Sequence, residues 1–209
     1  MRLTEYHPYI RSRIDQEKMA LGYAGPDFDV AVLELPSIFG TQPGRKPVWV
    51  FLVENIRSMK SFTMWPRGGS AMVTVKQVGQ AIAGALEKNQ GGKCYPIGWY
   101  NLTWKEMLKI CHKYLGCPNK KIVTIPNWMY AIGGRKLKKE QQQMGIEGGL
   151  DMVKFTDLQC SDQFIDKSQG CIPLGVTEDD IDAAIGDSIR LCVDILDGKA
   201  RNIIAMKGE

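Results

Sequence analysis

Tyr9 and Arg13 stand four residues apart in the run YIRSR. The sequence predicts a helix over 8–22, because Pro8 suits the first helical position and Gly22 suits the stop. Positions i and i+4 share one helix face, so the phenol and the guanidinium would lie side by side. A cation fixed beside a phenol favours the phenolate and makes it usable as an acid–base group at neutral pH. Because this spacing is common by chance, a solvated surface pair is the alternative interpretation.

The elements that must position this pair alternate between strand and helix along the chain. Short β-branched or apolar runs predict strands at 29–35, 71–75, 94–97 and 121–125. Apolar periodicity and capping signals predict helices at 78–86, 103–116, 127–145 and 179–196. The apolar run at 48–60 could be a helix or a strand, and its length favours a helix. This alternation favours an α/β fold with parallel strand pairs. Since no strand precedes the helix at 8–22, we expect the chain to begin in the middle of its fold.

Turn and cap residues set the expected boundaries of these elements. The Pro/Gly-rich stretch 36–47 should break regular structure, and 66–69 should form a turn. Thr103 with Glu106 forms a capping-box signature. The glycine pair at 133–134 should break the helix at 127–145, and Thr177 with Asp180 should start the last helix.

Composition excludes several classes of protein. The 209 residues are 44% apolar and 24% charged, which is typical of a globular chain, and the net charge is +4. The six cysteines and two histidines show no zinc-ligand spacing, so we expect free thiols, no metal site and a cytoplasmic location. No run is long enough to span a membrane and no signal peptide is visible, so we expect no membrane partner. The basic run at 135–139 is interpreted as a solvated helix face, with a nucleic-acid patch as the alternative.

Five segments, taken in order, resemble one enzyme family. The YIRSR run followed by Glu17 is similar to the YxxSK…E stretch in the active-site helix of extended short-chain dehydrogenase/reductases. The extended short-chain dehydrogenase/reductases are also called the NAD-dependent epimerase/dehydratase family. Further segments resemble later parts of that family and extend the resemblance over nearly the whole chain: VLELPSIFGTQPG (32–44), AMVTVKQVGQAI (71–82), CYPIGWYNLTWKEM (94–107) and QFIDKSQGCIPLGVTEDDIDAAIGDSI (163–189).

The resemblance implies roles for individual residues. Tyr9 matches the catalytic tyrosine, which moves a proton on or off a sugar hydroxyl or carbonyl. Arg13 matches the lysine that assists this tyrosine and contacts the ribose of the cofactor. Pro36 and Ser37 match the loop beside the nicotinamide. Arg67 lies where family members often have a basic residue near the substrate phosphates, and an ordinary solvent-exposed turn arginine is the alternative. NAD or NADP is therefore the implied cofactor, and a nucleotide-sugar-like small molecule the implied substrate.

The sequence departs from the family at several of these positions. Arg13 replaces lysine, Ser37 replaces asparagine, and Glu34 replaces arginine. Lys76 and Gln77 replace a pair of aspartates. An arginine has a longer, planar and forked head, so it does not reproduce the geometry of a lysine.

The glycine-rich phosphate turn of the family, GxGxxG or GxxGxxG, is absent from the sequence. The resemblance therefore implies an incomplete Rossmann-like sheet without its N-terminal cofactor-binding half. We expect 1–47 to hold the active-site helix with its following strand and loop, and 48–209 to form the substrate-binding lobe. The resemblance implies a truncated or split nucleotide-sugar epimerase/dehydratase/reductase-like protein, inactive alone, that pairs with a separate N-terminal half or with itself. The alternatives are a non-catalytic interaction module and a remnant without function.

Overall fold

The computed structural model describes residues 2–146, 148–200 and 203–204. It contains the strands β1 (Val30–Glu34), β2 (Ser37–Phe39), β3 (Phe62–Pro66), β4 (Gly69–Thr74), β5 (Gly92–Pro96), β6 (Tyr100–Thr103), β7 (Lys121–Ile125) and β8 (Asp162–Gln163). Its helices are α1 (Leu3–Tyr6), α2 (Pro8–Leu21), α3 (Val50–Ser58), α4 (Val75–Lys88), α5 (Trp104–Tyr114), α6 (Asn127–Gln143), α7 (Phe155–Gln159), α8 (Cys171–Leu174) and α9 (Ile181–Leu196). The chain is therefore a mixed α/β protein, as the sequence predicts.

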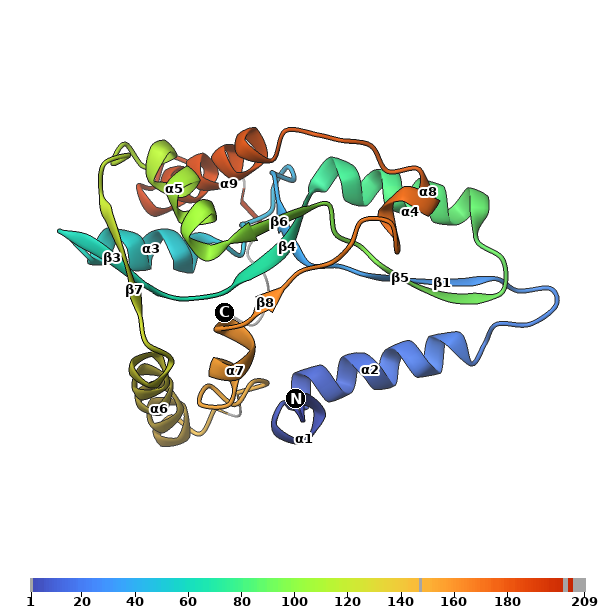
Figure 1. The fold of residues 1–209 in the computed structure, drawn as a ribbon, viewed down its shortest axis with the longest axis horizontal. Coiled ribbons are helices and arrows are strands. Elements are labelled where there is room, and N and C mark those ends of the chain that lie inside the picture. The colour runs from blue at the N-terminus through green and yellow to red at the C-terminus, as the bar shows by residue number, and fades with distance from the viewer. Residues whose placement is uncertain (1, 147, 201–202, 205–209) are drawn as a thin grey trace.

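The strands pair mainly in parallel. β1 pairs with β5, β2 with β4, and β3 with β7, all in parallel, while β6 joins β4 antiparallel and β8 joins β4 in parallel. Figure 1 shows α4, α5, α8 and α9 on one side of the strands, and α2, α6 and α7 on the other. This arrangement is consistent with a Rossmann-like fold.

The main core lies between β2, β4 and the helices α3, α5 and α9. It buries Phe39, Met72, Leu108 and Ile185 completely, together with other apolar side chains of the same helices. Phe39 stacks on the indole of Trp49 with ring centroids 4.3 Å apart. A second, smaller core lies under α4 and α8. Apolar burial on this scale is what stabilises the fold.

Several boundary predictions are confirmed. The predicted capping box forms at the start of α5, where Thr103 and Glu106 exchange hydrogen bonds with each other's backbone N–H groups. Gly116 follows α5 with a φ of 73°, the left-handed conformation of a helix-ending glycine. The ambiguous apolar run at 48–60 is helical as α3, in agreement with the argument from its length.

Other predictions are wrong. The stretch 36–47 was expected to lack regular structure, but it contains the strand β2. The strands β3 and β6 were not predicted. The helix α6 continues through Gly133 and Gly134 without a break. Gly134 packs against the backbone of Met152, which leaves no room for a Cβ at this position. The last helix is capped by the Asp180 side chain, which accepts a 2.9 Å hydrogen bond from the N–H of Ala183; Thr177 lies in the preceding loop.

The six cysteines are free thiols, as expected. Among the described residues, no helix combines the length and apolar character needed to cross a bilayer.

Candidate functional site

The structure places Arg13 beside Tyr9 on the exposed side of α2. The guanidinium carbon of Arg13 lies 5.0 Å from the centroid of the Tyr9 ring, within the range of a cation–π contact. The Arg13 Nη1 also donates a 3.0 Å hydrogen bond to Gln16 Oε1. Tyr9 is 49% exposed, so its phenol can be reached from outside the chain. The pair thus has the geometry that its i, i+4 spacing predicts.

The first turn of α2 is tied to residues 148–151, which link α6 to α7. The backbone N–H of Tyr9 donates a 2.8 Å hydrogen bond to the carbonyl of Gly149. The imidazole of His7 is fully buried, and its Nδ1 accepts a 3.1 Å hydrogen bond from the backbone N–H of Asp151. Because a backbone N–H can only donate, the His7 Nδ1 is the acceptor in this bond. These two bonds fix the end of the helix that carries Tyr9.

A salt bridge anchors this link to α6. Lys138 Nζ lies 2.6 Å from Asp151 Oδ2. Burial raises the pKa of the Asp151 carboxyl, but the Lys138 hydrogen bond and two backbone N–H groups outweigh it and leave that pKa below its usual value. The carboxylate stays charged at neutral pH, so the position of α2 is coupled to α6 through Asp151.

Pro36 and Ser37 lie at the junction between β1 and β2, and both are half-buried. Ser37 pairs with Met72 in the β2–β4 register, and its Oγ lies 3.4 Å from Ser70 Oγ. Arg67 lies in the exposed turn between β3 and β4. No contact recorded among the described residues joins Arg67 or Ser37 to Tyr9. The structure therefore brings together the catalytic candidates, Tyr9 and Arg13, and leaves the other candidates at separate positions.

Glu17, one turn beyond Arg13, forms a cluster with Glu34 of β1 and Cys94 of β5. Their potential ligand atoms lie within 4.8 Å of one another, and Cys94 Sγ donates a 3.4 Å hydrogen bond to Glu17 Oε1. Burial and then the Glu17 carboxylate raise the pKa of the Cys94 thiol to about 11. Burial and Glu17 also raise the pKa of Glu34. The Cys94 thiol is therefore protonated at neutral pH and acts as the donor in its hydrogen bond to Glu17.

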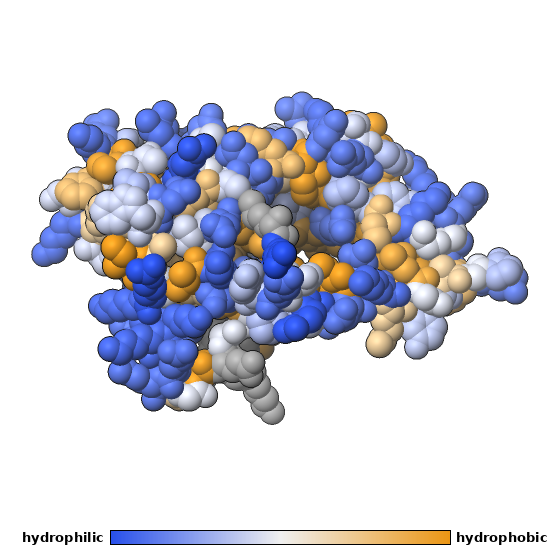
Figure 2. Space-filling view, turned by 60° about the horizontal axis from the view of Figure 1, so that its bottom comes forward, coloured by the Kyte–Doolittle hydropathy of each residue, from blue (hydrophilic) through white to orange (hydrophobic). Residues whose placement is uncertain are grey.

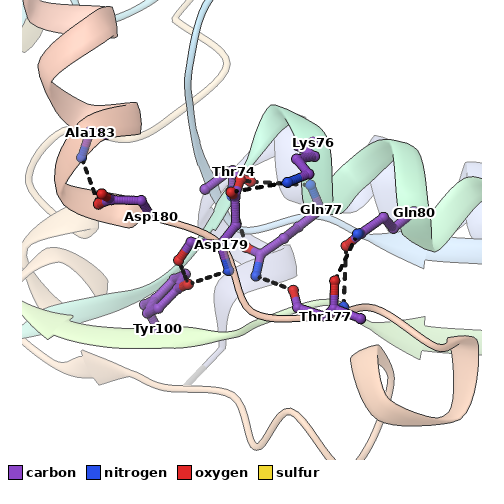
Figure 3. Close-up of polar contacts among 9 residues, drawn as sticks. All are labelled: Thr74, Lys76, Gln77, Gln80, Tyr100, Thr177, Asp179, Asp180 and Ala183. Carbon is purple, nitrogen blue, oxygen red and sulfur yellow. Dashed lines mark hydrogen bonds and ion pairs between the residues drawn. The ribbon is translucent and has the colours of Figure 1, made fainter.

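Lys76 and Gln77, which depart from the family pattern, belong to a polar network at the start of α4 (Figure 3). Gln77 is fully buried; its side chain accepts from the Thr74 N–H and donates to the carbonyl of Thr177 over 3.0 Å. The Asp179 carboxylate accepts a 2.7 Å hydrogen bond from Thr74 Oγ1 and lies 3.4 Å from Lys76 Nζ.

Two further contacts complete this network. The Tyr100 hydroxyl accepts a 2.9 Å hydrogen bond from the Asp179 N–H and donates to the Asp179 carbonyl. The Thr74 hydrogen bond is the main reason why the pKa of the Asp179 carboxyl lies below its usual value. The network therefore fastens the loop before α9 to α4 and β6, and this is the work that Lys76 and Gln77 do in the fold.

Sequence reasoning missed the residues that hold the candidate pair. Gly149 and Asp151 lie about 140 residues along the chain from Tyr9 and His7, to which they hydrogen-bond. The glycine pair at 148–149 was visible, but nothing in its spacing says that it packs on Tyr9. A Cβ on Gly149 would lie 3.1 Å from the Tyr9 Cβ, so a small residue suits this contact.

Comparisons with known proteins place this fold. No family model and no curated protein matches the chain. A nucleoside-diphosphate-sugar epimerase from Pseudomonas aeruginosa matches with a TM-score of 0.58 and 15% identity, over 90% of this chain and 55% of that one. RMD from Pseudomonas aeruginosa, solved with NADPH, matches with a TM-score of 0.55 and 12% identity, over 92% of this chain and 57% of that one.

A third solved structure matches the chain to a similar extent. UDP-glucose 4-epimerase from Bifidobacterium longum, solved with NAD+ and UDP, gives a TM-score of 0.55 and 13% identity, over 93% of this chain and 56% of that one. The chain thus spans little more than half the length of the solved structures it matches. At these identities the likeness shows a shared fold, which is that of nucleotide-sugar epimerases and related NAD(P)-binding proteins.

Proposed function

We propose that this chain is the active-site helix and substrate-binding lobe of an NAD(P)-dependent nucleotide-sugar epimerase, dehydratase or reductase-like protein. The observation that carries the proposal is the Tyr9–Arg13 pair, stacked on the exposed side of α2 in a fold shared with nucleotide-sugar epimerases. Residues 1–47 would supply the catalytic helix and the loop beside the cofactor, and 48–209 the substrate lobe, in a reducing cytoplasmic compartment.

The chemistry assigned to the pair is proton transfer. Tyr9 gives a proton from its phenolic oxygen to a substrate carbonyl, or takes one from a substrate hydroxyl. Arg13 stabilises the phenolate that forms or reacts in this step. When bound, a nicotinamide dinucleotide supplies the hydride acceptor or donor. Arg67 adds positive charge for the phosphates of a nucleotide-sugar-like substrate.

One end of a dinucleotide is assigned to this chain by the family resemblance, which gives Arg13, Pro36 and Ser37 to the nicotinamide ribose. The carboxylates of Glu17 and Glu34 would repel a pyrophosphate. We therefore propose that the pyrophosphate contacts come from a separate N-terminal half or from a second copy of the chain, and that this chain is inactive by itself.

An open strand edge supports a partner of this kind. Within the described residues β1 pairs with β5 on one side, and no strand occupies its other edge. Leu33 of β1 and the exposed Ile82 and Leu86 of α4 line an apolar hollow beside this strand. An unpaired edge next to apolar side chains is a surface on which another strand and helix can pack.

The test measures the binding of NAD(H) and NADP(H) by calorimetry, to this chain alone and together with a supplied glycine-rich Rossmann half. We expect little binding to the chain alone and clear binding to the pair, with hydride transfer that Tyr9→Phe reduces by about 100-fold or more. Tyr23→Phe, at another exposed tyrosine, is the matched control. Absence of binding in the reconstituted pair would refute the cofactor assignment, and full activity of Tyr9→Phe would refute the catalytic one.

A non-catalytic interaction module is the second candidate. It is favoured by the use of Lys76 and Gln77, where the family has aspartates, in the network that joins α4 to the loop before α9. Restoring the family residue with Arg13→Lys separates the two candidates. An enzyme should keep or gain turnover in the reconstituted pair, whereas a binding module should hold its protein partner with unchanged affinity and show no turnover in either form.

A further inference from the structure

The helix α6 presents an outward surface that the proposed function does not use. Trp128, Met129 and Ile132 are 63%, 40% and 52% exposed, respectively, although all three are large and apolar. Positions 128, 132, 136 and 139 fall on one face of a helix, so the apolar start of this face continues into basic residues. We define the α6 patch as Trp128, Met129, Ile132, Arg135, Lys136 and Lys139.

The basic half of the patch is weakly neutralised. Arg135, Lys136 and Lys139 are exposed, and Lys136 meets the Glu140 carboxylate at 3.9 Å. Within the described part of the chain, neither Arg135 nor Lys139 has an acidic partner. Lys138, by contrast, turns inward to Asp151. The patch therefore carries three cations against one carboxylate, and these cations are available to an anionic partner.

The neighbouring strand β3 extends the apolar surface. Thr63 hydrogen-bonds to His112 of α5 over 2.9 Å, so Phe62 and Met64 point to the opposite face of the sheet. They are 43% and 42% exposed, and α6 packs beside β3. Lys121 pairs with Phe62 in the β3–β7 register and is also exposed. The exposed Phe62 thus has an exposed basic residue beside it on β7.

We propose that the α6 patch docks on an anionic phospholipid surface. Exposed tryptophan and aliphatic side chains next to lysine and arginine are the combination that enters the headgroup region of such membranes. In Figure 1, α6 projects at the periphery of the molecule, away from the main core. Figure 2 brings this side forward and shows a hydrophilic block over α6 next to hydrophobic residues. Such peripheral contact requires no membrane-spanning helix.

Charge and shape favour this occupant over two others. A second copy, related by two-fold symmetry, would set one basic patch against another. A protein helix or strand would need a groove or an open edge to occupy, whereas the patch lies on the convex outer face of a helix. Arg135, Lys136 and Lys139 are solvent-exposed, as expected for a solvated helix face, and the structure adds exposed apolar neighbours to these charges.

The test measures co-sedimentation of the full chain with vesicles of phosphatidylcholine alone, and of phosphatidylcholine and phosphatidylserine in equal parts. We expect binding to the anionic vesicles, weak binding to the neutral ones, and a loss of binding as salt rises. The double change Lys136→Glu and Lys139→Glu should weaken binding at least about tenfold. Trp128→Ala should weaken it with the same salt dependence.

The matched control reverses two exposed lysines of α5, Lys105→Glu and Lys109→Glu, and should weaken binding far less. Thermal melts of all variants verify that they remain folded. Equal binding to both vesicle types, or an equal loss in the α5 control, would overturn the proposal. Absence of vesicle binding at low salt, together with binding to an acidic polypeptide such as polyglutamate, would overturn it in favour of an acidic protein partner.

Discussion

The helices α2 and α9 are nearly equal in length, at 14 and 16 residues, but they are held in different ways. α9 buries six residues, including Ile185, Ile189 and Cys192, between α3, α5 and the sheet. None of the residues of α2, all of which the structure describes, is buried. Tyr9 and Arg13 lie on α2, so the candidate catalytic pair lies on the less tightly packed of the two helices.

The difference follows from where the apolar residues fall. Ile181, Ile185 and Ile189 are spaced four apart and form one stripe along α9, which the core covers. In α2 the apolar residues follow no such stripe. Its attachment depends on Tyr9 at Gly149, on His7 at Asp151, and on contact with β1. Stability and site geometry are therefore carried by different sets of residues.

The largest effect should come from shortening the stripe of α9. Ile189→Ala should reduce the free energy of unfolding by about 2–5 kcal/mol, because it leaves a cavity in the main core. Ile14→Ala on α2, the matched change, should cost less than about 1 kcal/mol, because Ile14 is only partly buried. Urea denaturation followed by circular dichroism measures both. Equal losses would show that α2 is packed as firmly as α9.

The tight packing of α9 should also make it sensitive to an added methyl group at one of its glycines. A Cβ at Gly186 would overlap the ring of Tyr114, so Gly186→Ala should destabilise the fold by about 1–3 kcal/mol. At Gly79 of α4 nothing lies within 4 Å of the added atom. Gly79→Ala should therefore be neutral, or stabilise by up to about 1 kcal/mol through helix propensity. Thermal melts compare the two variants, and a Gly186→Ala variant as stable as Gly79→Ala would contradict the close approach of Gly186 to Tyr114.

The α9 side should lose stability in acid. The pKa of Asp179 lies below its usual value, chiefly through the Thr74 hydrogen bond. Such a carboxylate stabilises the fold above the unfolded pKa of about 3.9, and the gain is lost as pH falls through the lower folded value. Asp179→Asn should cost about 1 kcal/mol at pH 7 and progressively less below about pH 4. A difference that persists unchanged in acid would exclude the carboxylate as the cause.

On the α2 side, the pH dependence of stability should have the opposite sign and a smaller size. The pKa of Glu34 is raised by burial and by Glu17, so its neutral form favours the folded state, and this contribution is lost as pH rises through the folded value. Glu34→Gln should stabilise the chain at pH 7 by about 0.3 kcal/mol, since solvent screens this exposed pair. The gain should vanish below about pH 4. Glu54→Gln on the exposed side of α3 is the control and should change nothing at either pH.

Local signals in the sequence predicted the helices of both regions, because the helix expected over 8–22 is observed as α2 and the helix expected over 179–196 as α9. The stripe of α9, the α5 capping box and the strand β7 depend on neighbours within a few residues, and all three are present. The break expected at Gly133–Gly134 is absent, because glycines cost a helix only about 1 kcal/mol each and Gly134 is needed where α6 meets Met152.

The candidate site divides in the same manner. The adjacency of Tyr9 and Arg13 follows from helix geometry and was predictable from their spacing. The bonds from Gly149 and Asp151 to this helix join residues about 140 positions apart, and no local pattern encodes them. The same limit applies to Cys94, which only the β1–β5 register brings to Glu34.

The sparse attachment of α2 has a consequence for motion. A helix without buried side chains can open separately from the core, at a small fraction of the free energy of global unfolding. Its amide hydrogens should exchange with solvent well before those of α9, and the Tyr9 phenol should sample orientations that the core does not restrict. Any contact that covers α2 would therefore also set how long Tyr9 stays in one orientation.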